Sequence, residues 1–316
     1  MVKVRGLDLP INVKAELEEF SWKKAKWKGD RLIACSPFRD EQHPSFAVEF
    51  ENGTWIDSGG DGEWRKGNFV KLLSFLRGES YEETEEYLIS VYSPQFGDLD
   101  RLEIPDISDW LEEKRNNKIF DPSELKPFAY HHPYLERRGI PLNVQRAFDV
   151  GFDPTTQSVV LVWHDMKGNI VSWKHRSINS KIFWYVKGGQ PIRNHLYGIH
   201  WVVKRGYKTV WIVEAEIDAL TLWSQGIPAV AIGSSYLSYE KRNLILKVGV
   251  EKIVIATDND KDGRKAKRSI VEGLSGLVDL QEVVWDGLSY KDINEAREIV
   301  KELQINDVDI FDWGEI

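Results

Sequence analysis

Two segments of the chain share the same order of strand, acidic residue and helix. An apolar, β-branched run at 210–213 ends on Glu214, and the helical pattern that follows at 215–225 is closed by a glycine and a proline. A second apolar run at 252–256 ends on the sequence DNDKDG, after which a new helix begins near Arg264. Ligands bind at the carboxyl ends of the strands in an open α/β sheet. The pattern therefore predicts an α/β fold in which two acidic clusters, far apart in sequence, can converge on one edge.

Carboxylates at such an edge are suited to a hard divalent cation. Mg²⁺ takes several oxygen ligands and retains part of its water, so two or three carboxylates and substrate phosphates make a natural site for phosphoryl transfer. The structural alternative is that Glu214 caps its helix near the positive end of the helix dipole, and that 258–262 is a solvated turn. A calcium EF-hand is excluded, because the twelfth position counted from Asp258 is Ser269 and a strand precedes the loop.

Length, charge and cysteine content narrow the class of protein. The 316 residues suffice for two or three domains, and neither a membrane-spanning run nor a signal peptide is present, so we expect a cytoplasmic protein without a membrane partner. The net charge of −8 is segregated: 79–113 contains twelve acids and one base, whereas 137–208 contains twelve Lys or Arg and three acids. Such a basic region attracts phosphates. The single Cys35 excludes an internal disulfide and any cysteine-rich zinc site within one chain.

The acidic segments resemble the Toprim module shared by bacterial-type primases, topoisomerases and some nucleases. The resemblance lies in VEAEIDAL at 213–220, TDNDKDGRKA at 257–266 and YKDINEA at 290–296, with Ala215 where glycine is usual and Ile293 in place of proline. It implies catalytic roles for Glu214, Asp258 and Asp260. The metal ligands that it implies are Glu214, Asp258, Asp260, Asp262 and Asp292.

Residues 35–76 resemble the zinc-binding domain at the start of bacterial-type primases. Cys35, the PSF at 44–46 and the glycine-asparagine at 67–68 fit that pattern, but Arg39 stands where histidine would be and the paired cysteines are missing. Tetrahedral zinc needs four nitrogen or sulfur ligands. We therefore expect this domain to fold without zinc, around an aromatic core of Phe38, Phe46, Trp55 and Trp64. A less favoured alternative is a metal site of Cys35 and His43 completed by Asp57 or Asp61.

The segment SWKKAKWKGDR at 21–31 interleaves basic and aromatic residues. Lysines attract phosphates and indoles stack on unpaired bases, as in single-strand binders. This pattern gives four candidate single-strand contacts: Trp22, Lys24, Trp27 and Lys28. The alternative is a solvated basic face with both tryptophans packed beneath it.

The middle of the chain, 126–205, resembles the amino-terminal half of a primase catalytic core. PYLERRGIPLNVQRAFDVGFDP and HLYGIHWV fit that family, and SVVLVWHDMKGNIVSWKHRS independently predicts a β-hairpin that turns at 165–168. Alternation points Lys174 and Arg176 to the same face of the second strand. The resemblance implies that template or nucleotide phosphates contact Arg146, Lys174, Arg176 and Lys181.

We therefore predict an α/β protein in three parts. A small α+β, zinc-ribbon-like domain with an acidic linker occupies 1–105, a basic subdomain with a mixed sheet occupies 106–205, and a parallel α/β Toprim subdomain occupies 206–316. The resemblance implies a DNA primase, a DNA-directed RNA polymerase that joins ribonucleoside triphosphates on single-stranded DNA with Mg²⁺ or Mn²⁺ and no zinc. A replicative helicase is a further candidate partner, and so compact a primase would suit a phage or plasmid.

Two other functions remain open at this point. A weak or inactive primase relative that binds single-stranded DNA is favoured by the missing zinc ligands and by Ala215. A Toprim nuclease would direct water at a phosphodiester with the same acids, but it needs no triphosphate site, so the primase-like hairpin argues against it.

Overall fold

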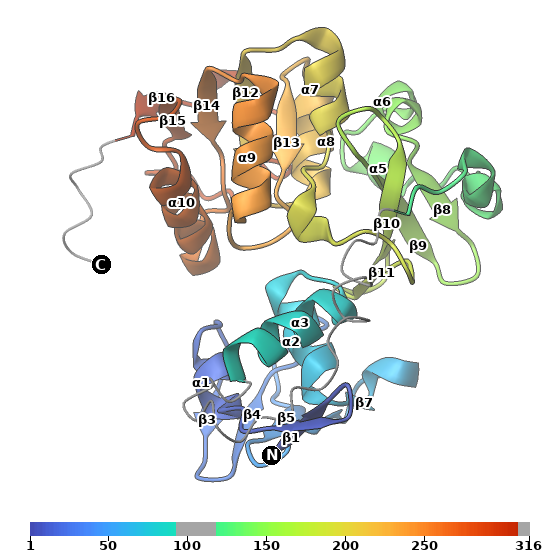
Figure 1. Cartoon of the computed structure of the whole chain (residues 1–316), viewed down its shortest axis with the longest axis vertical. Coiled ribbons are helices and arrows are strands. Elements are labelled where there is room, and N and C mark those ends of the chain that lie inside the picture. The colour runs from blue at the N-terminus through green and yellow to red at the C-terminus, as the bar shows by residue number, and fades with distance from the viewer. Residues whose placement is uncertain (93–117, 309–316) are drawn as a thin grey trace, which may run out of the picture. The chain divides into compact units, whose positions relative to one another are not determined.

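The computed structural model describes residues 1–92 and 118–308 and divides the chain into two compact units (Figure 1). The first unit comprises Met1–Lys118 with Asn179–Trp184, and the second comprises Ile119–Ile178 with Tyr185–Ile316. The linker and the boundary predicted near residue 105 lie outside the described residues. No helix in the described part of the chain is long and apolar enough to cross a membrane.

The first unit is built on an antiparallel sheet with helices on its buried side. In β5 (Phe46–Glu49) buried and half-buried residues alternate, as expected of a strand with one face in the core. The sheet order is β3 (Lys26–Trp27), β4 (Arg31–Ala34), β5, β6 (Trp55–Asp57) and β7 (Lys66–Gly67). This unit also contains the hairpin β1 (Val2–Val4) and β2 (Leu7–Leu9), the short helix η1 (Gly62–Trp64), and helices α1 (Val13–Glu18), α2 (Phe69–Arg77) and α3 (Tyr81–Tyr92).

The aromatic core predicted for this unit is present. The ring of Phe38 lies 5.9 Å from that of Phe46, 5.0 Å from Trp55 and 4.9 Å from Trp64, measured between centroids. Phe75 of α2 completes the group at 4.8 Å. These rings meet edge-on or tilted, the arrangement that aromatic quadrupoles favour.

Beside this core, Arg39 forms a network of charged hydrogen bonds. One guanidinium nitrogen lies 2.8 Å from Asp57 Oδ1, 2.8 Å from Glu41 Oε2 and 2.7 Å from Ser45 Oγ, and the other contacts Asp57 Oδ2. Burial alone would raise the pKa of Asp57, but the hydrogen bonds from Arg39 hold it below its ordinary value. The residue at the position of a zinc-ligating histidine is therefore the centre of an ion-pair network.

The alternative metal site gains no support from this geometry. Both carboxylate oxygens of Asp57 are engaged by Arg39, Cys35 is buried, and His43 is exposed. A fold that needs no zinc stays a prediction that metal analysis can test.

The second unit contains two sheets. The predicted hairpin is formed by β9 (Ser158–His164) and β10 (Ile170–Ser177), which pair antiparallel, and β8 (Gly151–Asp153) pairs with the other edge of β9. Short helical segments precede them: η3 (Pro122–Phe128), α5 (Tyr134–Arg137) and α6 (Leu142–Ala147). Every residue of β9 is buried, so the strand is covered on both faces.

The other sheet is the predicted parallel one. Its order is β13 (Ala229–Ala231), β12 (Thr209–Val213), β14 (Lys252–Ile255), β15 (Asp279–Val283) and β16 (Ile305–Asp307), with β16 antiparallel to its neighbour. The helices of this part are α7 (Ile199–Arg205), α8 (Glu216–Ser224), α9 (Tyr239–Val248) and α10 (Lys261–Leu274). The near-continuous apolar runs of β12 and β14 follow from burial on both faces. The α/β fold class predicted from the sequence is confirmed.

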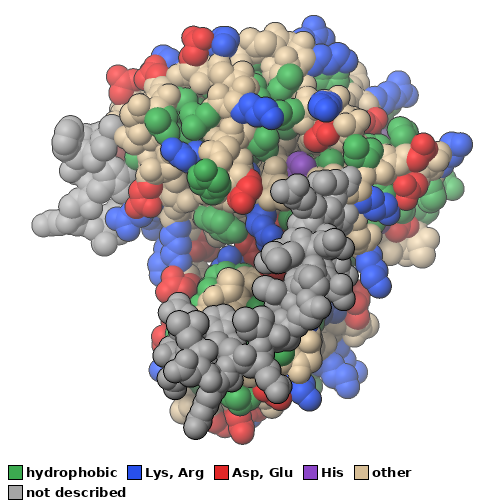
Figure 2. Space-filling model, in the orientation of Figure 1, with side chains coloured by type: hydrophobic (Ala, Val, Ile, Leu, Met, Phe, Trp, Pro, Cys, Tyr) green, Lys and Arg blue, Asp and Glu red, His purple; other side chains and the backbone are tan. Residues whose placement is uncertain are grey.

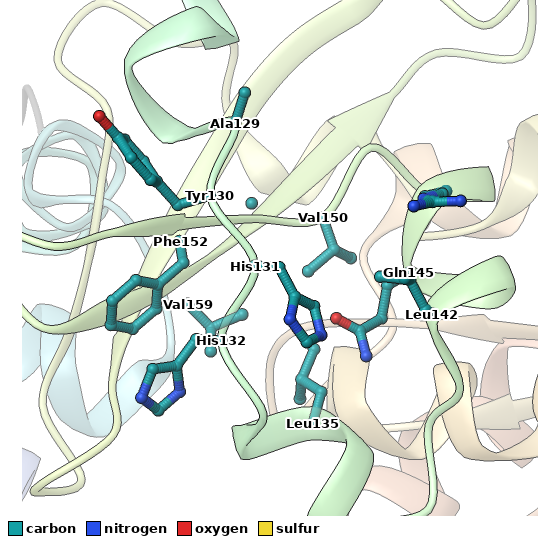
Figure 3. Close-up of a pocket in the computed structure, with 12 residues that line it drawn as sticks. Ala129, Tyr130, His131, His132, Leu135, Leu142, Gln145, Val150, Phe152 and Val159 are labelled. Carbon is teal, nitrogen blue, oxygen red and sulfur yellow. The ribbon is translucent and has the colours of Figure 1, made fainter.

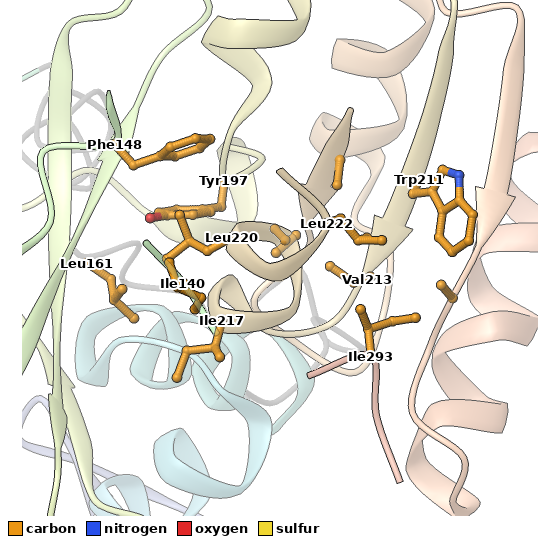
Figure 4. Packing of buried hydrophobic residues seen from close by; sticks show 14 of the residues in the cluster. Ile140, Phe148, Leu161, Tyr197, Trp211, Val213, Ile217, Leu220, Leu222 and Ile293 are labelled. Atoms are coloured by element: carbon orange, nitrogen blue, oxygen red, sulfur yellow. The ribbon is translucent and has the colours of Figure 1, made fainter. Parts of the chain in front are cut away.

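One hydrophobic core joins the two sheets of the second unit. Figure 4 shows Leu161 of β9, Tyr197 before α7 and Val213 of β12 in the same cluster, with Ile293 at its far side. No break in packing falls at the boundary predicted between residues 205 and 206, because a single cluster includes residues from both sides of it. The division of this unit into two subdomains stays a prediction.

Candidate active site at the edge of the parallel sheet

The first two predicted acids meet because their strands are neighbours. β12 and β14 run parallel with Ile212 opposite Ile255, so Glu214 and Asp258 leave the sheet at the same edge. The backbone N–H of Asp258 donates a hydrogen bond of 2.9 Å to Glu214 Oε1. The convergence expected from the sequence is therefore present in the structure.

The third acid, Asp260, caps the helix that follows. Its Oδ1 accepts hydrogen bonds from the backbone N–H groups of Asp262 at 3.0 Å and Gly263 at 2.9 Å. This cap makes α10 begin at Lys261, a little before the start predicted near Arg264. Gly263 is required here, because a Cβ at this position would lie 1.9 Å from the carbonyl oxygen of Asp258.

A loop from the third motif lies beside these acids. The ammonium of Lys291 lies 3.5 Å from Asp258 Oδ2 and 3.6 Å from Asp260 Oδ2. The backbone N–H of Asn259 donates to the carbonyl of Lys291 at 2.7 Å, which ties the two loops together. Asp292, predicted as a metal ligand, directly follows Lys291 in the sequence. Its carboxylate accepts a 2.8 Å hydrogen bond from the N–H of Glu295.

The acids raise one another's pKa values. Burial, together with the charge of Asp258, raises the pKa of Glu214 to about 8. Burial and neighbouring acids likewise raise the pKa of Asp258 to about 6, although Lys291 acts in the opposite direction. Burial and Asp260 also raise the pKa of Asp262. The negative charge collected here is larger than Lys291 alone neutralises, which favours binding of a further cation.

The arrangement of ligand atoms suits a cation but is not a closed metal cage. The Oδ2 atoms of Asp258 and Asp260 both lie near the ammonium of Lys291, so a single cation at that position could contact both carboxylates. Among residues 1–92 and 118–308, no three His, Cys, Asp or Glu side chains are grouped as metal ligands. A divalent ion that keeps waters and takes substrate oxygens needs only one or two such carboxylates.

Glu216, which the sequence did not single out, connects the hairpin to this edge. It is buried in the first turn of α8, where Lys174 of β10 lies 3.2 Å from its carboxylate and the indole N–H of Trp163 donates to it at 3.2 Å. Arg176, half-buried on the same strand, lies within electrostatic range of Glu216, and burial lowers the pKa of both Lys174 and Arg176. Only the pattern of an extra acid, in VEAEID, signalled this position.

A second connection runs through Asn294. Its backbone N–H donates to Asp218 Oδ1 at 2.9 Å, and its side chain donates to the carbonyl of Arg138 at 2.8 Å. The guanidinium of Arg138 donates in return to Asn294 Oδ1 at 2.8 Å. The turn before α6, the start of α8 and the third acidic motif are thus held in one hydrogen-bonded arrangement.

The other two predicted phosphate contacts lie elsewhere. Arg146 is exposed on α6 and lines a pocket described below. Lys181 belongs to the segment that clusters with the first unit, where its ammonium pairs with Asp40 at 2.7 Å. On the face drawn in Figure 2, basic side chains are scattered among acidic and neutral ones. A phosphate-binding role for these residues stays a prediction.

The four candidate single-strand contacts divide into packed and exposed residues. Trp22 stacks on the buried ring of Phe46 at 5.7 Å and donates its indole N–H to the carbonyl of Leu17, so it belongs to the core of the first unit. Trp27 is 38% exposed, with one face stacked on Phe50 at 6.0 Å. The ammonium of Lys24 donates to the carbonyl of Gln42 at 2.6 Å, and Lys28 is exposed.

Comparison with known families agrees with this site. Residues 211–297, which contain all three acidic motifs, match the model of the Toprim-like family. The second unit therefore contains a Toprim-like domain.

The chain is also related in sequence to bacterial-type DNA primases. It is 28% identical to the DNA primase of Mycoplasma pneumoniae and 23% identical to that of Mycoplasma genitalium, over 86% of this chain in each case. The match spans 54% of each primase, about half its length. An uncharacterized SPbeta prophage-derived protein of Bacillus subtilis is 24% identical over 73% of this chain and 75% of its own length. The resemblance predicted from the sequence is confirmed.

Two solved primase structures share a limited likeness with this chain. The zinc-binding and RNA polymerase domains of the Aquifex aeolicus primase match with a TM-score of 0.44 at 20% identity, covering 94% of this chain and 84% of that one. The primase fragment of the bacteriophage T7 primase-helicase matches with a TM-score of 0.45 at 25% identity, covering 59% and 80%.

Proposed function

We propose that the chain is a primase-type nucleotidyltransferase that synthesises short RNA primers on single-stranded DNA. The observation that carries this proposal is the contact between Glu214 and Asp258 across neighbouring parallel strands, with Asp260 capping the adjacent helix. Three carboxylates from two strand ends are thereby concentrated at one edge of a Toprim-like domain, beside the loop of the third motif.

Each acid has a proposed part. Asp258 and Asp260 hold Mg²⁺ or Mn²⁺ through the oxygens that now face Lys291, with Asp262 and Asp292 further out. A divalent ion bound there would neutralise charge on the triphosphate and polarise the attacking hydroxyl. Glu214 serves as a ligand or accepts the proton of the primer 3′-hydroxyl, and the N–H of Asp258 fixes the orientation of its carboxylate.

The basic residues orient the nucleic acid in this proposal. Arg146 and Arg176 contact phosphates of template or ribonucleoside triphosphate, and Lys174 positions Glu216 at the start of α8. In the first unit Trp27 and Lys28 are the exposed residues best suited to contact single-stranded DNA. A helicase partner and a cytoplasmic location belong to the same proposal.

A second candidate function, single-strand binding without synthesis, is favoured by one observation. The ammonium of Lys291 already lies between Asp258 and Asp260, so it supplies a covalently attached positive charge where a metal ion would bind. If that ammonium cannot be displaced, the site is neutralised from within and no catalytic ion enters. Binding of DNA would then survive without turnover.

The test is primer synthesis by the full chain. Purified protein is incubated with single-stranded DNA, Mg²⁺ or Mn²⁺ and labelled ribonucleoside triphosphates, and the products are separated on a gel. Asp258→Ala should abolish the products while leaving DNA binding intact. The matched control is Asp279→Ala, which removes an exposed aspartate at the amino end of β15, away from the acidic edge.

The outcomes separate the candidate functions. Products that vanish in Asp258→Ala and persist in Asp279→Ala support the primase. Synthesis undiminished by Asp258→Ala would refute the assigned acids. Shortening of the single-stranded DNA, followed by an end label in a parallel reaction, would support a nuclease. Binding without either reaction would support the second candidate.

A further inference from the structure

The second unit contains a pocket that none of the acidic motifs explains. It encloses about 260 Å³ between the segment that leads into α5 and α6 and the strands β8 and β9 (Figure 3). Leu135, Leu142 and Val159 supply apolar walls. Its volume is slightly below the range of ~300–1,000 Å³ for small-molecule sites, which suits a ligand as small as one planar ring system.

Aromatic rings form one side of this pocket. The imidazole of His132 lies flat on Phe152, with centroids 4.3 Å apart and planes 13° from parallel. The N–H of Tyr134 donates to His132 Nδ1 at 3.3 Å, which fixes the orientation of the ring. His131 is held at 3.1 Å from the carboxylate of Glu136. A stacked, oriented pair of rings is the kind of surface on which a nucleobase packs.

A buried amide lies at the inner end. Gln145 is only 5% exposed and donates its side-chain N–H to the carbonyl of Ile140 at 2.8 Å. This bond fixes the amide and leaves its carbonyl oxygen as the acceptor; Figure 3 shows that oxygen turned toward His131. A fixed acceptor beside stacking rings suits a base that carries an exocyclic amino group.

A cation stands at the outer end. Arg146 follows Gln145 on α6, lines the pocket and is exposed. Within residues 1–92 and 118–308, its guanidinium forms no ion pair or side-chain hydrogen bond, so its donors are available to a ligand. Arginine binds phosphate oxygens through two parallel N–H groups.

We propose that this pocket holds one unstacked base of a nucleotide, with the adjoining phosphate on Arg146 and the amino group of the base on Gln145. The ligand is a nucleotide of single-stranded DNA or a free nucleoside triphosphate, since both present the same chemistry. Cytosine, adenine and guanine, which carry exocyclic amino groups, bind better than thymine, which has none. The inference rests on the proposed nucleic-acid substrate but not on the polymerisation step.

The test is binding of fluorescently labelled octamers to the full chain by anisotropy. Octamers of dC and dT are compared, and unlabelled CTP is added as competitor. Arg146→Ala should weaken binding of the dC octamer about tenfold, the size of one lost charge-assisted contact. The matched control, Arg137→Ala, removes an exposed arginine that does not line the pocket and should change affinity less than twofold.

Two further variants probe the interior. Gln145→Met keeps the length of the side chain and should bring the affinities for dC and dT octamers together. Leu142→Trp fills the pocket from a half-buried position on α6 and should weaken binding as much as Arg146→Ala does. Thermal unfolding of each variant shows whether it remains folded.

The results identify the source of the bound base and show whether the pocket binds it. Competition by CTP that depends on Arg146 identifies a free nucleotide as the ligand, and binding of octamers alone identifies the template. Equal losses in Arg146→Ala and Arg137→Ala would overturn the proposal, as would unchanged binding in a folded Leu142→Trp. If pocket-dependent binding persists while the wild-type chain makes no primers, the proposed function fails and this inference stands. If the chain makes primers and every pocket variant binds normally, the proposed function stands and this inference fails.

Discussion

Replacing Arg39 should destabilise the first unit more than any exposed charge does. The side chain of Asp57 is 0% exposed, and both its oxygens are engaged by the guanidinium of Arg39. Arg39→Met leaves that carboxylate buried without its cation, together with the half-buried Glu41. Breaking one partner of a buried pair costs about 3–5 kcal/mol. Because Arg39 keeps 25% of its surface in water, we expect the lower end, about 3 kcal/mol.

The measurement must isolate the first unit. Thermal unfolding followed by amide hydrogen exchange in peptides from β4 to β6 monitors this sheet independently of the second unit. A domain of about this size loses about 4 °C or more of melting temperature per kcal/mol, so a decrease above ~10 °C is expected. The double variant Arg39→Met with Asp57→Leu should recover part of the loss, since well-packed apolar residues can replace a buried pair.

Arg31→Met is the matched control. Arg31 pairs with Asp30 and Glu49 on the same sheet, but its side chain is 40% exposed. Exposed pairs contribute little to stability, because water and salt screen the charges. If Arg39→Met costs no more than Arg31→Met, the network around Arg39 does not stabilise this unit and the reasoning is refuted.

Three other changes test separate parts of the structure. Gly263→Ala should displace the loop that carries the acids and lower both the unfolding midpoint and primer synthesis, because its Cβ would lie 1.9 Å from a backbone oxygen. Gly273→Ala is the control: it lies on the same helix with its nearest contact at 3.3 Å, and it should leave both unchanged or raise stability by ~0.5–1 kcal/mol. The pKa of Asp57 is lowered in the folded state, so its contribution to the stability of the first unit is complete above about pH 4 and is lost as the pH falls through the lowered pKa. Urea midpoints of the first unit measured from pH 7 to 3 should therefore drop only at the acid end. Trp22→Ala should cost about 2–3 kcal/mol, less than a fully buried aromatic, whereas Trp27→Ala should barely alter unfolding and should weaken single-strand binding; the reverse ranking in either assay would contradict the division between packed and exposed indoles.

The periodicity of the sequence was sufficient to predict the strands and helices that carry the acids. Apolar runs bounded by Gly and Pro placed β12 and β14, and the strand-end rule placed Glu214 beside Asp258. The start of α10 was displaced because the side chain of Asp260 caps the helix, an event that hydrophobic periodicity does not register.

The environment of the basic hairpin was less predictable. Alternation predicts a common face for Lys174 and Arg176, but it did not indicate that Lys174 is buried. The partner of Lys174 is Glu216, which comes from a different sheet-to-helix turn. Burial of a charged strand depends on what packs over it, and in this chain the covering residues come from distant sequence.

The same limit explains how the first unit was interpreted. The sequence identified Arg39 as a departure from a zinc ligand and offered Asp57 as a ligand for an alternative metal, yet the two residues are partners of each other. A zinc ion holds separate loops together through one positive centre and several donors. The guanidinium of Arg39 supplies a positive centre with several donors of its own, and it ties the loop that contains Glu41 and Ser45 to Asp57 at the end of β6. Because this cation is covalently attached, we expect a chelator to leave the first unit folded where it would unfold a zinc-dependent domain.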